Sequence, residues 1–139
     1  MVINTFALGT WVTGVKFARA LCGVANKKDI KMTVANTGMV FDSAIKIIEN
    51  FADEYDQVLL AGYPPFVKGL VEELIEKKTI KNVEMHIMVG AESFPEEWRD
   101  YMTKLLQTQY DYEPTILSAY GAADVGLELG YEQPITKLF

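Results

Sequence analysis

The stretch QVLLAGYPPFVKGLVEELIE, residues 57–76, decides the fold that we expect for this chain. It opens with an apolar run, residues 57–61, which has the length and composition of a buried strand. Two prolines follow at once, and proline suits the first turn of a helix because its missing N–H would have no partner there. Apolar residues then recur at helical spacing: Phe66, Leu70 and Leu74. A strand that leads directly into an amphipathic helix indicates an α/β fold.

The same alternation extends along most of the chain. Apolar runs predict strands at residues 2–8, 30–35, 57–61, 83–89 and 115–118. Helical periods predict helices at residues 14–24 and 42–52, a third from Pro64 and a fourth from Ser93. Asp42 is the predicted N-cap of the second helix, and Ser93 with Glu96 forms the predicted capping box of the fourth.

Strands that alternate with helices predict right-handed crossovers and a three-layer α/β sandwich, with a mainly parallel five-stranded sheet and helices on both faces. We expect residues 1–126 to form a single α/β subdomain. Residues 127–139 show no clear pattern and are interpreted as an irregular tail that continues into parts of a larger domain. Ligands of such sheets bind beyond the carboxyl ends of the strands, so the five loops at that edge are the candidate site.

Composition excludes several classes of protein. The chain has 139 residues, a formal net charge of -6 and no cluster of Lys and Arg, so we expect no binding to nucleic acid. Cys22 is the single cysteine, which excludes a disulfide framework and a thiolate metal site. No basic segment opens the chain and no run approaches the roughly 20 apolar residues of a membrane helix, so we predict a cytoplasmic protein without membrane contact. Whether it forms a homo-oligomer stays open.

Known nucleotide motifs with a strict spacing are missing. Gly121 and Gly126 have the spacing of a P-loop, but Leu127 and Glu128 stand where Lys and Ser or Thr are required. No G-x-G-x-x-G opens a helix either. His86, in the middle of an expected strand, is interpreted as a packed histidine with satisfied hydrogen bonds rather than a catalytic one.

Other side chains at the expected edge allow two interpretations. Glu92 follows a strand end, where it serves either the site or the amino end of the next helix. The aromatic residues Phe6, Trp11, Tyr63 and Phe66 also fall there. Core packing explains Phe66, whereas Trp11 is equally compatible with lining a pocket.

Four segments in order resemble the large domain of adenylate-forming (AMP-binding) enzymes, in the branch of the phenylacetate-coenzyme A ligases. VINTFALGTWVTG resembles the segment around the acid pocket, and residues 34–76 resemble a strand, helix, strand, Pro-containing loop and helix. VGAESFPEEWRDYM is similar to the loop that approaches the purine, and SAYGAADVG to the motif Tyr-Gly-small-small-acid. The resemblance covers residues 2–126.

The resemblance implies an acid–coenzyme A ligase that uses ATP and Mg²⁺ to convert a carboxylic acid to its acyl-adenylate and then transfers the acyl group to coenzyme A. It assigns Tyr120 to stacking on adenine, and Gly90 and Ala91 to close approach of the backbone to the purine. The remaining nucleotide-binding residues implied are Glu92, Gly121, Ala122 and Ala123. Asp124 would hold Mg²⁺, and the acid would lie against Phe6, Trp11 and Gly14.

Parts that the resemblance requires are missing from the sequence. We find no Ser/Thr/Gly-rich phosphate loop, no aspartate for the ribose hydroxyls and no lid with a catalytic lysine, so no catalytic residue is assigned. We therefore expect the chain to be the central part of such a domain, inactive alone. The alternatives are a stand-alone, non-catalytic α/β module that binds a nucleotide or another small molecule, and a purely structural domain.

Overall fold

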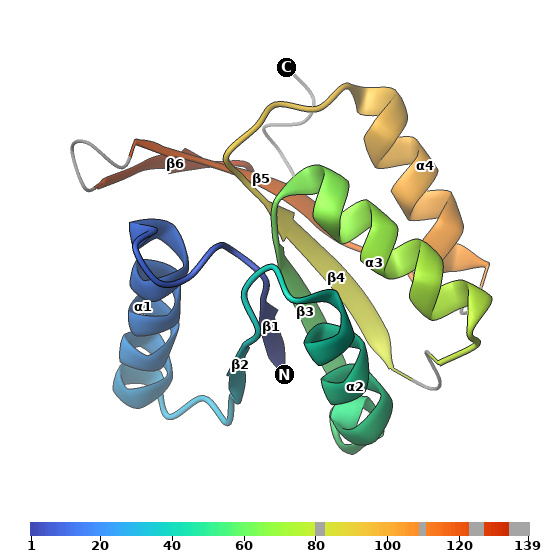
Figure 1. Cartoon of the computed structure of the whole chain (residues 1–139), viewed down its shortest axis with the longest axis horizontal. Helices are drawn as coiled ribbons and strands as arrows, with labels where there is room; N and C mark the ends of the chain where they lie inside the picture. Colours follow the sequence, from blue (N-terminus) through green and yellow to red (C-terminus); the bar gives the residue numbers. More distant parts are fainter. Residues whose placement is uncertain (80–82, 109–110, 123–126, 134–139) are drawn as a thin grey trace.

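Strands and helices alternate along the chain, as Figure 1 shows. The computed structural model describes residues 1–79, 83–108, 111–122 and 127–133. The strands are β1 (Val2–Asn4), β2 (Val34–Asn36), β3 (Gln57–Gly62), β4 (Glu84–Val89), β5 (Ile116–Ala122) and β6 (Leu127–Tyr131). The helices are α1 (Val12–Lys28), α2 (Phe41–Phe51), α3 (Pro64–Glu76) and α4 (Glu96–Gln107), with a short 3₁₀ turn, η1 (Ala52–Glu54), after α2.

The sheet has the strand order β2-β1-β3-β4-β5-β6. The first five strands in this order are parallel, and β6 pairs antiparallel with β5. The prediction of an α/β fold with a mainly parallel sheet is confirmed. The chain moves outward from β1 to β2 and then in the opposite direction through β3, β4 and β5, so the direction of the connections reverses between β1 and β3.

The two faces of the sheet carry different amounts of packing. Ile3, Leu60 and Ile87 point into the larger core, which α2, α3 and α4 cover. Val2 and Ala61 point the other way and pack with Phe17 of α1 in a smaller cluster. Figure 1 shows α1 alone on its side of the sheet. In the described part of the chain, no helix combines the length and the apolar character needed to cross a membrane.

Three local predictions are wrong. Residues 127–131 form a sixth strand instead of an irregular segment, because they return antiparallel along β5. Asp42 lies inside the first turn of α2, whose N-cap is Val40. Ser93 caps nothing: α4 begins at Glu96, behind an extended Pro95, and the Glu96 carboxylate accepts hydrogen bonds from Arg99 instead.

Candidate functional site

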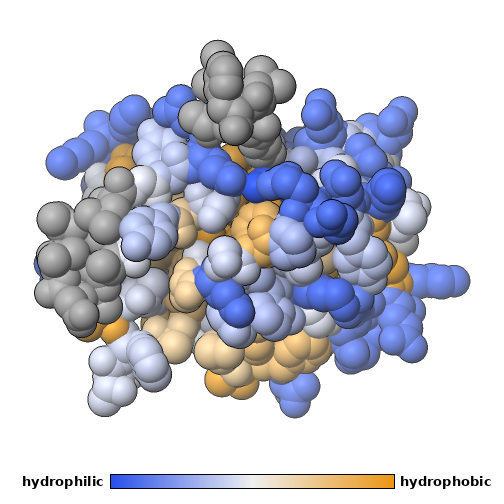
Figure 2. Space-filling view, turned by 90° about the horizontal axis from the view of Figure 1, so that it is seen from above, coloured by the Kyte–Doolittle hydropathy of each residue, from blue (hydrophilic) through white to orange (hydrophobic). Residues whose placement is uncertain are grey.

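The carboxyl ends of the parallel strands point upward in Figure 1, so Figure 2 shows this edge from above. Apolar surface reaches the middle and one margin of the edge, between polar borders (Figure 2). The reversal of the connections between β1 and β3 is the place where open α/β sheets bind their ligands. The loops predicted to form the site all begin at this edge: 5–11, 37–40, 63, and 90–95, with the end of β5 beside them.

Asn4, which sequence reasoning missed, ties three parts of this edge together. It is fully buried, and its Nδ2 donates to Gly14 O at 2.8 Å and to Asn36 Oδ1 at 2.8 Å. The backbone N–H groups of Thr37 and Gly38 donate to its carbonyl, each at 3.1 Å. A polar pair, Asn-Thr, at the end of an apolar strand is the sequence signal that could have revealed it, because buried polar groups need hydrogen-bond partners.

Phe6 and Gly14 are placed in the packing beneath the edge. Phe6 is 7% exposed, and its ring lies edge-on to that of Phe17 with the centroids 5.5 Å apart. Gly14 is so close to the preceding loop that a Cβ there would be 2.6 Å from Ala7 O. Trp11, by contrast, is 67% exposed at the start of α1. Of the three residues assigned to the acid, only Trp11 therefore has a side chain available at the surface.

Gly90 brings the carboxyl ends of β3, β4 and β5 together. Its N–H donates to Gly62 O at 3.2 Å, and a Cβ on it would lie 3.0 Å from Ala119 O and 3.6 Å from Phe6 Cζ. Ala91 follows in the left-handed region, with φ of 74°, a conformation that few residues with a side chain adopt. The neighbour of Ala119 in β5 is Tyr120, whose side chain is 69% exposed. The two segments assigned to adenine thus meet at one edge, although about thirty residues separate them in the sequence.

Glu92 contacts the loop after β3. Its carboxylate accepts a hydrogen bond from the Tyr63 hydroxyl, and this bond, together with burial and the negative charge of Glu92, raises the pKa of Tyr63 above its ordinary value. The helix α4 has no side-chain cap at its amino end, so capping is not the role that Glu92 plays. The bond joins two of the five loops.

The other predicted residues are distributed as follows. Gly121 is exposed on β5 and Ala122 ends that strand, whereas Ala123 and Asp124 lie outside the described residues. Within the described ranges no three His, Cys, Asp or Glu side chains gather as a metal site would require. His86 is half-buried in β4, where Nδ1 accepts a hydrogen bond from Thr115 N at 3.0 Å, which confirms the interpretation as a packed histidine.

No model of a protein family matches the chain, and no curated protein matches it. The assignment of the edge residues therefore depends on the sequence resemblance and on the geometry described above.

Proposed function

We propose that this chain supplies the adenine-binding edge of an ATP-dependent acid–coenzyme A ligase. The observation that carries the proposal is the meeting of the Gly90 loop with β5 at the carboxyl edge, where a Cβ on Gly90 would lie 3.0 Å from Ala119 O. Tyr120, next along β5, presents a ring that is 69% exposed. An exposed aromatic ring one residue along the strand from this close backbone approach supports a site for a flat base such as a purine.

In the proposed reaction a carboxylate attacks the α-phosphate of ATP, which forms the acyl-adenylate and releases pyrophosphate. The thiol of coenzyme A then takes the acyl group and releases AMP. In this chain Gly90, Ala91 and Tyr120 would hold the adenine, and Asp124 would hold Mg²⁺ beside the phosphates. When bound, Mg²⁺ would neutralise part of the phosphate charge, because this hard cation binds carboxylate and phosphate oxygens. No residue of this chain is assigned to the chemical step itself.

The experiment is a titration of the purified chain with AMP, in which ligand-detected NMR measures binding. Stacking on one ring is worth about 1 to 3 kcal/mol, so we expect a dissociation constant in the millimolar range or weaker. Tyr120→Ala should abolish the signal, because the ring is the main contact available.

Tyr131→Ala is the matched control for this experiment. Tyr131 is 66% exposed on the same pair of strands, but it pairs with Ala119, whereas Tyr120 pairs with Gly130, so the two rings lie on opposite faces. AMP binding should survive Tyr131→Ala. Equal AMP signals from wild type and Tyr120→Ala would remove the adenine assignment.

A further inference from the structure

The strand that carries Tyr120 changes partners along its length. Residues 116–118 of β5 pair with β4, whereas residues 119–122 pair with β6. Tyr120 therefore lies beyond the parallel sheet, on a two-stranded ribbon that projects from the molecule in Figure 1. A two-stranded ribbon is marginally stable alone, so the place of Tyr120 depends on what holds the base of the ribbon.

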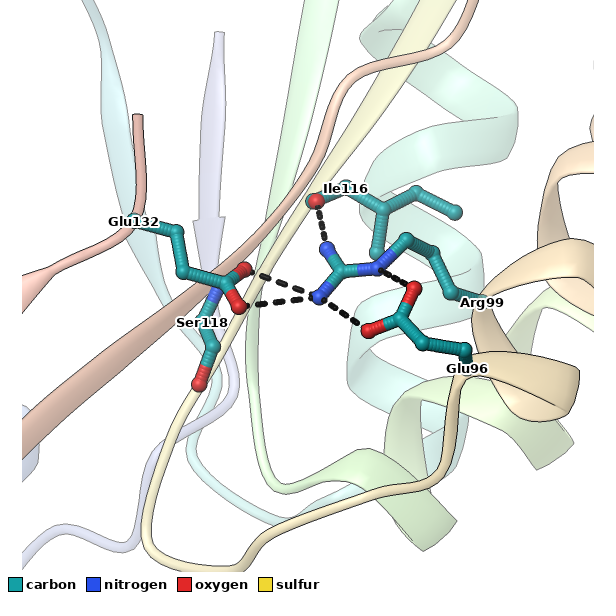
Figure 3. Close-up of polar contacts among 5 residues, drawn as sticks. All are labelled: Glu96, Arg99, Ile116, Ser118 and Glu132. Atoms are coloured by element: carbon teal, nitrogen blue, oxygen red, sulfur yellow. Dashed lines mark hydrogen bonds and ion pairs between the residues drawn. The ribbon is translucent and has the colours of Figure 1, made fainter. Parts of the chain in front are cut away.

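Arg99 of α4 holds that base, as Figure 3 shows. Its side chain is 8% exposed and lies between two carboxylates. Nη1 donates to Ile116 O, and Nη2 donates to the two carboxylate oxygens of Glu132 at 2.9 and 3.0 Å. Nε donates to Glu96 at 2.9 Å, and the guanidinium carbon is 4.9 Å from the centre of the Phe94 ring. One side chain thus connects α4 with β5 and with the residue that follows β6.

Glu132 completes the connection at the point where the ribbon leaves the sheet. Its Oε2 accepts a hydrogen bond from Ser118 N at 2.9 Å, and its own N–H donates to Ser118 O at 2.9 Å. Ser118 is the last residue of β5 that pairs with β4. Glu132 is therefore bonded both to Ser118, where β5 leaves β4, and to Arg99 of α4.

Charge makes this contact expensive to break. Burial lowers the pKa of Arg99, but hydrogen bonds and the charges of Glu96 and Glu132 outweigh that effect, so the pKa is raised above its ordinary value and the guanidinium stays charged. Removing Glu132 would leave the buried guanidinium with the largely exposed Glu96 as its ion-pair partner, so the Arg99–Glu132 contact contributes more than an exposed ion pair would.

We propose that Arg99 and Glu132 form a clamp that fixes the direction in which the β5–β6 ribbon leaves the sheet and so positions Tyr120 beside the Gly90 loop. Both are positioning residues, because neither belongs to the loops assigned to a ligand. The link to nucleotide binding depends on the proposed function, whereas the holding of the ribbon does not.

Hydrogen exchange of backbone amides, read by NMR, tests the clamp in the variant Glu132→Gln. This change keeps the shape of the side chain but removes its charge. We expect the amides of residues 119–122 and of β6 to exchange roughly tenfold faster or more, because a charged hydrogen-bond network at their base is weakened. Amides of β3, which exchange when the whole chain unfolds, should accelerate by no more than the same factor, and the urea midpoint should fall by no more than that factor implies. Glu97→Gln, which removes an exposed carboxylate from the same first turn of α4, is the matched control. It should change neither the exchange of the ribbon amides nor the urea midpoint.

Several results would overturn the clamp. Ribbon amides that exchange equally in wild type and Glu132→Gln would do so. Ribbon amides of wild type that exchange as slowly as those of β3 would do so too, because the ribbon would then open only when the whole chain unfolds. AMP titration of the same proteins separates the two proposals. If wild type binds no AMP, the proposed function fails and exchange alone still decides the clamp. If wild type binds AMP and Glu132→Gln loosens the ribbon but binds AMP equally well, the positioning of Tyr120 is refuted.

Discussion

At the scale of single residues, His86 shows how a packed side chain couples the fold to pH. Its Nδ1 accepts a hydrogen bond from Thr115 N at 3.0 Å, which requires this nitrogen to be unprotonated. Burial lowers the pKa of His86 below its ordinary value of 6.5, although Glu84, 3.8 Å from Nε2, opposes the shift. The ring of Tyr112 stands edge-on to it, with the centroids 6.1 Å apart.

The pKa shift of His86 predicts a loss of stability in weak acid. As the pH falls below 6.5, the unfolded chain takes up a proton more readily than the folded one, so the free energy of unfolding decreases through the lowered folded pKa. His86→Asn keeps an acceptor near Nδ1 but does not titrate. Urea denaturation at roughly pH 7.5 and 5.5 should therefore show a smaller loss for the variant than for wild type. Equal losses would contradict the assignment to His86.

At the scale of elements, α1 packs tightly against the preceding loop at Gly14. A Cβ at Gly14 would lie 2.6 Å from Ala7 O and 2.8 Å from Phe6 O, both backbone atoms that move only with the loop. Gly23, nine residues later in the same helix, has nothing within 4 Å of such a Cβ. One substitution at two positions of one helix can therefore separate close packing from helix propensity.

We predict opposite effects of the two substitutions on stability. Gly14→Ala should lower the free energy of unfolding by about 1 to 3 kcal/mol, because the loop between β1 and α1 must shift. Gly23→Ala should raise it by about 0.5 to 1 kcal/mol, since alanine loses less conformational entropy in a helix. Urea denaturation of both variants is the measurement. A loss of stability in both would mean that Gly23 is also confined, and a gain in both would mean that the loop moves without cost.

How well the sequence predicts the bounds of each helix or strand depends on how distinct its residue pattern is. α3 begins at Pro64 as predicted, because its prolines and apolar stripe give one unambiguous signal. α1 extends four residues beyond the predicted end at residue 24, since apolar residues surround the helix and weaken its period. β6 has the alternation Leu-Glu-Leu of a strand, yet it was missed because its partner is an extension of β5 beyond the parallel sheet.

The candidate site was predictable where it follows from topology. Gly90 and Tyr120 fall at the ends of neighbouring strands, so parallel pairing alone brings their segments together. The buried ion pair of Arg99 with Glu132 could not be predicted. A charged residue in the first turn of a helix usually faces solvent, and nothing in the sequence links these two positions. Phe6 was assigned to the ligand, but the structure packs it edge-on to Phe17, a contact that no local pattern shows.

At the scale of the whole molecule, the sheet divides the protein into two unequal cores. The side chains of α2, α3 and α4 that face the sheet are fully buried, with Leu70 and Met102 at 0% exposed. On the other face, α1 contributes Phe17 to a small cluster, while its Val12, Val15 and Val24 remain exposed. Elements with fewer buried contacts open at lower free energy. The longest helix should therefore be among the least stable.

This inequality predicts that α1 opens without unfolding the rest of the chain. Leu70→Ala should lower the global free energy of unfolding by about 2 to 5 kcal/mol and accelerate exchange throughout β3 and β4, because it empties the larger core. Phe17→Ala should accelerate exchange mainly in α1 and the loop before it, with a smaller global effect. Native-state hydrogen exchange with parallel urea denaturation distinguishes the two patterns. If α1 amides of wild type exchange as slowly as those of α3, the two cores are one cooperative unit. If α1 does open alone, Trp11 and Gly14 move with it, so the part of the edge assigned to the acid would loosen while the part assigned to adenine stays fixed on β4 and β5.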